Sequence, residues 1–109
     1  RQVLRRVESE RAGQFVEFDL VLVNGKEVVA LEAKSVFTTN DVRNFLRRLA
    51  LFRDAFPQYA PYRTLGGVAA MRFAGETDRF AHRQGLFVLR FAGGLMEIAN
   101  PLNFRPKAF

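Results

Sequence analysis

The sequence contains no cysteine and no tryptophan among its 109 residues, and it has a single histidine, His82. Disulfide bonds and thiolate chemistry are therefore excluded, and so is a cluster of histidine metal ligands. No apolar run approaches the roughly 20 residues that a membrane-spanning helix needs. No glycine-rich stretch has the spacing of a nucleotide-binding loop. These absences predict a cytoplasmic protein without a membrane partner.

The composition predicts one folded domain that covers residues 1–109. Hydrophobic residues make up 49% of the chain and charged residues 26%, as in globular proteins, and the length suits a single core. The chain begins with Arg1 rather than methionine. We therefore expect the domain to be excised from a longer protein.

Basic residues outnumber acidic ones by 17 to 11, which gives a net charge of +6. Only Lys26, Lys34 and Lys107 are lysines, so the basic residues are mostly arginines. The planar guanidinium group binds phosphate through two hydrogen bonds, and a positive balance favours polyanionic partners. The charge therefore raises the case for a nucleic-acid partner, although arginine-rich genome composition would produce the same count.

The first third of the chain predicts a helix followed by a hairpin. Val3, Leu4 and Val7 lie on one helical face, which predicts a short helix over residues 1–12. Two apolar runs, 15–23 and 27–36, then meet at Asn24-Gly25. Asn-Gly between apolar runs is a strong hairpin signal because both residues tolerate positive φ.

The rest of the chain alternates helices and strands. Thr38 or Thr39 is a candidate cap for a long helix, with Asp41 in its first turn and Pro57 at its end. The further expected segments are a looser stretch 57–64, a strand 65–73 whose paired glycines suggest a closely approaching backbone, a helix 76–84 ended by Gly85, a hairpin around Gly93-Gly94, and an irregular tail 100–109 that Phe104 and Phe109 could anchor.

These segments predict an α/β fold in the order α-β-β-α-β-α-β-β. The strand–helix–strand passage over residues 27–73 predicts a parallel strand pair, and the neighbouring hairpin makes the sheet mixed. We therefore expect a mixed β-sheet flanked by helices.

Four charged residues interrupt the first hairpin. With Asn24-Gly25 as its turn, Glu17 faces Glu32 and Asp19 faces Ala30. Side chains alternate across a strand, so the charges gather on one face of the hairpin, away from its turn. They are Glu17, Asp19, Glu32 and Lys34.

Three acids and one lysine so arranged repel one another, and a divalent cation would remove that penalty. The alternative is an ordinary solvated face in which Lys34 neutralises an acid. Two observations favour a site. The charged face is apolar at its other end, and a lysine, with a compact and tunable ammonium group, stands beside the acids of an arginine-rich chain.

At these residues the sequence resembles the PD-(D/E)XK nuclease superfamily. Asp19 matches the first acid of its motif, and Glu32-Ala33-Lys34 matches the Asp/Glu-x-Lys triplet on the next strand. The superfamily has a restriction-endonuclease-like α-β-β-β-α-β core, which the expected order fits over most of the chain. The segments NGKEVVALEAKS, FRDAFPQY, GGVAAM and RQGLFVLR resemble an uncharacterised bacterial branch in which the domain follows a coiled coil.

The resemblance implies a Mg²⁺- or Mn²⁺-dependent nuclease that hydrolyses phosphodiester bonds of DNA. Asp19, Glu32 and the Ala33 carbonyl would hold the ion, and Lys34 would orient the attacking water or stabilise the transition state. Glu17 could bind a second ion. Glu8 or Glu10 could add a ligand from the first helix, although both fit exposed helix charges.

Arg43, Arg47 and Arg48 lie mostly off the apolar stripe of the long helix. They could bind backbone phosphates, or they could form a solvated helix face. The alternative function is a catalytically inactive domain of the same fold that acts as a nucleic-acid-binding or dimerisation module. The sequence also leaves a homodimer open.

Overall fold

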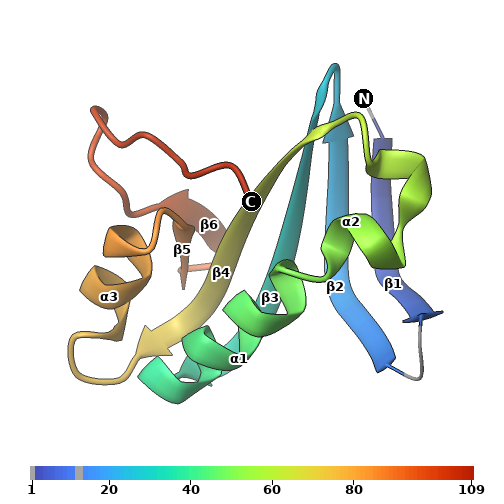
Figure 1. Cartoon of the computed structure of the whole chain (residues 1–109). Helices are drawn as coiled ribbons and strands as arrows, with labels where there is room; N and C mark the ends of the chain where they lie inside the picture. Colours follow the sequence, from blue (N-terminus) through green and yellow to red (C-terminus); the bar gives the residue numbers. More distant parts are fainter. Residues whose placement is uncertain (1, 12–13) are drawn as a thin grey trace.

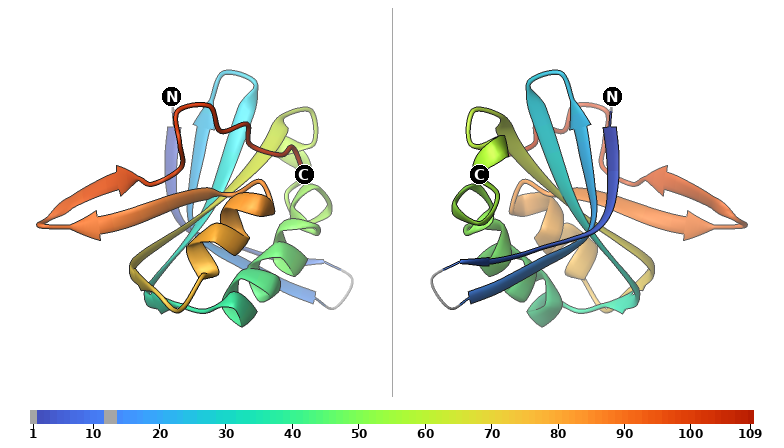
Figure 2. Two further views of the ribbon diagram at one scale, coloured as in Figure 1. Left: turned by 90° about the vertical axis from the view of Figure 1, so that its left-hand side faces the viewer. Right: turned by 90° about the vertical axis from the view of Figure 1, so that its right-hand side faces the viewer.

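The computed structural model describes residues 2–11 and 14–109. Six strands form one mixed sheet in the order β1-β2-β3-β4-β5-β6, and the described helices lie on one side of it (Figures 1 and 2). The strands are β1 (Gln2–Arg11), β2 (Gln14–Asn24), β3 (Glu27–Phe37), β4 (Arg63–Phe73), β5 (Phe87–Ala92) and β6 (Leu95–Ile98). The helices are α1 (Thr39–Leu49), α2 (Phe52–Ala55), the 3₁₀ turn η1 (Pro57–Tyr59) and α3 (Thr77–Arg83).

The α/β class and the mixed sheet are confirmed, but the predicted first helix is wrong. Residues 2–11 form β1, which pairs antiparallel with β2 and brings Val3 opposite Leu22 and Val7 opposite Phe18. A helix of about ten residues is marginal by itself, whereas β-branched residues suit a strand, and pairing here satisfies the edge of β2. The order therefore begins with three strands, not with a helix.

The turn of the β2–β3 hairpin lies one residue later than predicted. Asn24 pairs with Glu27, so Gly25 and Lys26 make the turn. Gly25 has φ 60° at the first turn position, where type I′ and II′ turns both need a positive φ. Each residue of β2 is consequently paired with a residue of β3 two positions later than predicted. Every side chain keeps its face of the sheet, but its cross-strand partner changes.

The predicted long helix is broken into α1 and α2. Thr38 caps α1, since its hydroxyl accepts from the Asp41 amide and its own amide donates to the Asp41 carboxylate. The chain turns after Leu49, and Phe52 then packs edge-on to Phe18 with their ring centres 5.5 Å apart. The break therefore lets α2 cover the end of β2 (Figure 1).

Strands β3 and β4 are parallel, as predicted from the helical crossover between them. Side chains, rather than another backbone, approach the paired glycines of β4. A Cβ on Gly66 would meet the tips of Leu49 and Leu86, and one on Gly67 would meet Leu31. The glycines thus make room for the core on one face of β4 and for Leu31 on the other.

The C-terminal third follows the predicted pattern. Gly85 has φ 84° and ends α3, with the Leu86 amide donating to the Ala81 carbonyl. Strands β5 and β6 form the hairpin around Gly93-Gly94. The tail returns to the sheet, where the Phe109 amide donates to the Thr64 carbonyl.

The buried core lies between the helices and one face of the sheet. No described helix is long and apolar enough to cross a membrane. The opposite sheet face carries no described helix (Figure 2). Leu20, Leu22 and Val29 stay partly exposed there, whereas Leu31 is buried. Core residues with no measurable exposure are Phe18, Val21, Val28, Ala30, Phe37, Val42, Phe45, Phe52, Val68, Ala70, Ala81 and Leu86.

Candidate functional site

Asp19 lies where the pairing of β2 and β3 stops. The last paired residues are Leu20 and Leu31. Beyond them, the Ala33 amide donates to Oδ2 of Asp19 at 2.9 Å, so a side chain replaces the neighbouring strand as hydrogen-bond partner. The carboxylate of Asp19 therefore lies against the peptide that joins Glu32 to Ala33.

This position corrects the predicted register and strengthens its consequence. The prediction placed Asp19 opposite Ala30, but Val21 occupies that position. Continued past its last pair, the observed register brings Asp19 level with Glu32 instead. The two carboxylates that the superfamily motif requires are thus closer in register than the sequence predicted.

The Ala33 carbonyl lies at the same edge of β3 as its amide. The amide and the carbonyl of one residue in a strand project toward the same neighbour. Because the Ala33 amide points at Asp19, its carbonyl also points toward β2, beyond the last strand pair. Asp19 and Ala33 can therefore present oxygens to one space.

Glu32 is largely shielded from solvent. Its side chain is only 12% exposed, and its Oε1 lies 2.6 Å from the guanidinium of Arg48. Its Oε2 is buried without a hydrogen-bond partner. Such an oxygen is costly because it has lost water and gained nothing in return. Glu32 thus retains one unsatisfied oxygen, on the residue that the observed register brings level with Asp19.

Arg48 faces the sheet rather than solvent. Its guanidinium donates to the Glu17 carbonyl at 3.0 Å as well as pairing with Glu32. It also lies over the rings of Phe18 and Phe45, at 6.0 and 5.7 Å from their centres. Arg48 therefore links α1 to β2 and β3 through one cation.

The inward direction of Arg48 was missed in the sequence, although a signal exists. Arg48 follows Phe45 by three residues and precedes Phe52 by four, so it borders the apolar stripe. Arg43 and Arg47 are exposed, which both a phosphate-binding face and a solvated helix face would show. Arg43 lies over Phe80, and Arg47 donates to Asn44.

Lys34 is exposed on β3, next to the start of α1. No hydrogen bond or ion pair within the described residues joins it to Asp19 or Glu32. Its charge contributes to a lowered pKa of Asp41, after the larger effect of the hydrogen bond from the Thr38 amide. Lys34 is thus available to a ligand, but the structure does not place it in contact with either acid.

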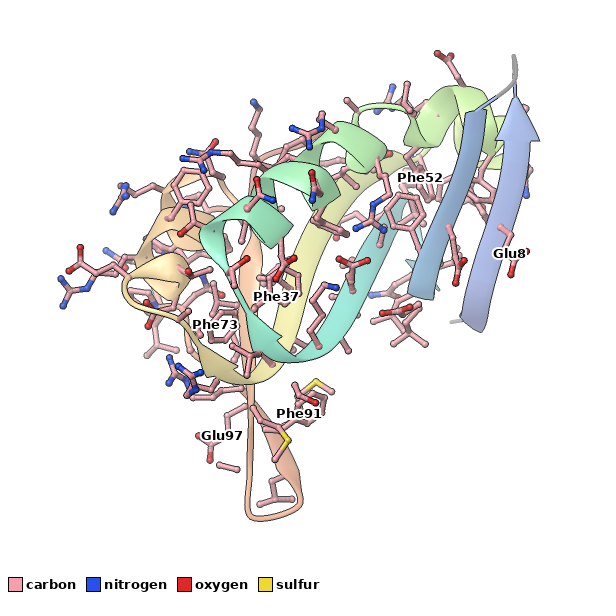
Figure 3. All side chains as sticks on the ribbon, turned by 90° about the horizontal axis from the view of Figure 1, so that it is seen from below. Glu8, Phe37, Phe52, Phe73, Phe91 and Glu97 are labelled. Atoms are coloured by element: carbon pink, nitrogen blue, oxygen red, sulfur yellow. The ribbon has the colours of Figure 1, made fainter. Side chains whose placement is uncertain are left out.

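The other predicted acids lie on the outer hairpin of β1 and β2. Glu8 is exposed on a strand, not on a helix, and pairs directly with Glu17 (Figure 3). Glu10 pairs with Phe15 in the same ladder. Within residues 2–11 and 14–109, no three acidic, histidine or cysteine side chains gather as a metal cluster. A metal site here would consequently rest on two carboxylates and a carbonyl.

A second polar cluster surrounds Asn100 at the base of the β5–β6 hairpin. Its Oδ1 accepts from the Val88 amide at 2.7 Å, and its Nδ2 donates to the Leu86 carbonyl at 3.2 Å. The same Nδ2 lies 3.1 Å from Nδ1 of His82. Asn100 is thus satisfied by contacts that hold the hairpin to α3, and His82 takes part in them.

No protein-family model matches the chain, and no curated protein or solved structure matches it either.

Proposed function

We propose that this chain is a PD-(D/E)XK-type nuclease that hydrolyses phosphodiester bonds of DNA with Mg²⁺ or Mn²⁺. The observation that carries the proposal is the partnerless, buried Oε2 of Glu32, which belongs to the residue directly before the Ala33 amide that donates to Asp19. Two carboxylates and a carbonyl suit Mg²⁺, which binds one or two protein carboxylates and keeps several waters. The residues present therefore fit the ion.

The order of elements also supports the proposal. Three consecutive antiparallel strands, a helix and a parallel strand follow one another as β1-β2-β3-α1-β4. This succession corresponds to the β-β-β-α-β part of the superfamily core. Strand β1, which replaces the expected first helix, is the first of these three antiparallel strands.

In this mechanism Asp19, Glu32 and the Ala33 carbonyl would hold the ion. The bound ion would polarise the phosphate and make a water molecule nucleophilic near neutral pH. Lys34, exposed on the same strand, would orient that water or stabilise charge on the phosphate. Arg43 and Arg47 would contact backbone phosphates on either side, a sequence-independent contribution that salt weakens.

The cysteine-free composition supports a cytoplasmic location as part of the same proposal. The net charge of +6 is consistent with a DNA substrate but does not distinguish it from RNA.

The alternative is a catalytically inactive domain of this fold that binds nucleic acid or dimerises. The ion pair of Arg48 with Glu32 favours it, because a guanidinium then supplies the positive charge that the motif reserves for a metal ion. A nuclease requires that Glu32 binds a metal ion, either through its second oxygen or by releasing Arg48 so that the ion takes the place of the guanidinium. The inactive module requires neither.

Cleavage of supercoiled DNA with millimolar Mg²⁺ tests the proposal. We expect Asp19→Asn and Lys34→Ala each to lower the rate by about a hundredfold or more while the fold persists. The matched controls are Asp54→Asn and Lys26→Ala, which remove exposed charges elsewhere and should retain the rate. Equal rates in all four variants would trace the cleavage to a contaminant.

A crystal soaked in Mn²⁺ separates metal binding from catalysis. We expect anomalous density between Asp19 and Glu32 in the native chain and in Lys34→Ala, and none in Asp19→Asn. A native chain without that density, whose DNA affinity depends on Arg43 and Arg47 but not on Asp19, would be the inactive module.

A further inference from the structure

The β5–β6 hairpin extends beyond the rest of the sheet and is apolar on its surface (Figures 2 and 3). Five large apolar side chains at this end are between 36% and 67% exposed. We call them the hairpin patch: Met71, Phe91, Leu95, Met96 and Ile98. Phe91 and Met96 pair directly across the hairpin, and Phe91 and Glu97 project to opposite sides (Figure 3).

Strand β6 also leaves backbone hydrogen-bonding groups free. It is the last strand of the sheet, and all four of its residues are exposed. The Ala99 amide donates to the Val88 carbonyl at 2.7 Å. Because the pairing alternates along an antiparallel ladder, Met96 and Ile98 turn their amides and carbonyls outward. An exposed strand edge of this kind is a template for another strand, and the single charge of β6, on Glu97, limits the registers in which the pairing is favourable.

We propose that a second copy of this chain pairs antiparallel with β6, so that two sheets join into one across a two-fold axis. Such an axis perpendicular to the sheet keeps each face continuous and places the same patch on both sides of the contact. The inference does not depend on the proposed nuclease function, because it uses neither the carboxylates nor a metal ion.

Charge selects the register of this contact. A pairing centred on Glu97 would place two carboxylates directly opposite each other, which destabilises a sheet. A pairing centred on Met96 avoids this contact and brings Leu95 of one copy opposite Glu97 of the other. The structure therefore favours Met96 at the two-fold axis.

The same register seats Ile98 against a hollow of the other copy. Centred on Met96, the pairing places Ile98 beside the partner's Gly94. Gly94 lines a hollow of about 420 Å³, open to the helix-free face of the sheet. The residues that line it with Gly94 are Ala33, Lys34, Ser35, Met71 and Phe91.

The patch sets an upper limit on the strength of the dimer. With about 200 Å² for a large side chain, the exposed parts of the five residues amount to roughly 500 Å² per chain. Leu95 lies on the other face from Met96, and Met71 lies on β4, two strands from the edge. A symmetric contact would therefore bury less than roughly 1,000 Å², the size of a weak interface. The free backbone edge adds hydrogen bonds to this area.

Sedimentation equilibrium of the native chain at micromolar concentration is the first test, and we expect twice the 12.4 kDa mass of one chain. Ile98→Lys places a charge at the edge of the sheet. This variant should sediment with the mass of a monomer, and its circular dichroism spectrum should match that of the native chain. Leu102→Lys is the control, since Leu102 is fully exposed outside the patch. A native monomer, or a dimer that persists in Ile98→Lys, would overturn the inference.

A single introduced cysteine tests the register, because the natural chain has none. Hydrogen-bonded antiparallel partners have Cα atoms about 5.5 Å apart, which a disulfide can span. Met96→Cys should therefore form a covalent dimer on mild oxidation, at least tenfold faster than Leu102→Cys. Equal rates for the two variants would place the interface elsewhere and contradict the pairing.

Discussion

Two hairpins of the sheet, β2–β3 and β5–β6, have similar apolar sequences but opposite surroundings. Val21, Val28 and Ala30 of the first hairpin are completely buried under α1 and α2. Leu95 and Ile98 of the second are more than half exposed. Composition therefore does not decide which hairpin is buried. The crossover from β3 to β4 carries α1 and α2 over one, and no described element covers the tip of the other.

The acids of the two hairpins differ in the same way. Glu32 is buried, pairs with Arg48 and retains a partnerless oxygen, whereas Glu97 is exposed at the hairpin tip. A buried carboxylate interacts strongly with any cation that reaches it, because little water screens the charge. The β2–β3 hairpin, covered by helices, is thus suited to bind an ion. The uncovered β5–β6 hairpin is suited to contact another protein chain.

The largest effect expected is on stability, from one phenylalanine of each hairpin. Phe18 is completely buried against Phe45 and Phe52, so Phe18→Ala should lower the free energy of unfolding by about 4 kcal/mol. Phe91→Ala should cost about half as much or less, at most about 2 kcal/mol for the single chain, because Phe91 is already 36% exposed. Urea denaturation at low protein concentration measures both. Similar losses would show that the second hairpin is packed after all.

The next effect concerns the cation of the covered hairpin. Arg48→Met should lower the free energy of unfolding by about 2 kcal/mol, since Glu32 then keeps a buried charge without a partner. If Glu32 is a metal ligand, millimolar Mg²⁺ should recover part of this loss and should stabilise Arg48→Met more than the native chain. Thermal unfolding with and without Mg²⁺ gives the comparison.

Arg47→Met is the matched control for that experiment, because Arg47 is exposed and its side chain donates only to Asn44 among the contacts described above. It should change stability by less than about 0.5 kcal/mol, with no response to Mg²⁺. An Arg48→Met variant that is equally insensitive to Mg²⁺ would favour the inactive module over the nuclease.

Much of the fold was predictable because its signals are local. A cap at Thr38, a glycine at Gly85 and the Gly93-Gly94 turn each act within a few residues. The strand conformation of residues 2–11 was not predictable, because their apolar spacing fits a helix. They form a strand through pairing with β2. The turn at Gly25 was off by one residue because both Asn24 and Gly25 tolerate the required φ.

The candidate site was predictable in part for a similar reason. Asp19 and Glu32 lie on strands joined by a short turn, so their proximity follows from the hairpin. Arg48 lies 16 residues after Glu32 in the sequence, so their ion pair depends on how α1 packs against the sheet. The spacing of Arg48 from Phe45 and Phe52 indicates that its side chain borders the apolar stripe, but not that it meets Glu32. Local pairing was therefore predicted, and the cation supplied by tertiary packing was not.

A smaller effect is expected at the junction that begins the cover of the first hairpin. Thr38 caps α1 through its hydroxyl and through its amide bond to Asp41. Thr38→Ala should lower the free energy of unfolding by about 1 kcal/mol. Thr39→Ala is not a neutral control, because the Thr39 hydroxyl contacts Thr77 of α3. Asn40→Ala, at an exposed position of the first turn, is the better comparison, and an equal loss there would contradict the capping role.

The smallest effect is the pH dependence of this cap. The hydrogen bond from the Thr38 amide is the main cause of a lowered pKa of Asp41. Partial burial raises this pKa, and the Thr38 hydroxyl and the charge of Lys34 lower it further. A carboxyl with a lowered folded pKa stabilises the fold above its unfolded pKa of 3.8 and loses that contribution as the pH falls through the folded value. The urea midpoint of the native chain should therefore fall more between about pH 5 and pH 3 than that of Asp41→Asn. Asp54→Asn, which removes an exposed acid, should retain the native slope, and parallel curves for the native chain and Asp41→Asn would show that the cap does not depend on the charge of Asp41.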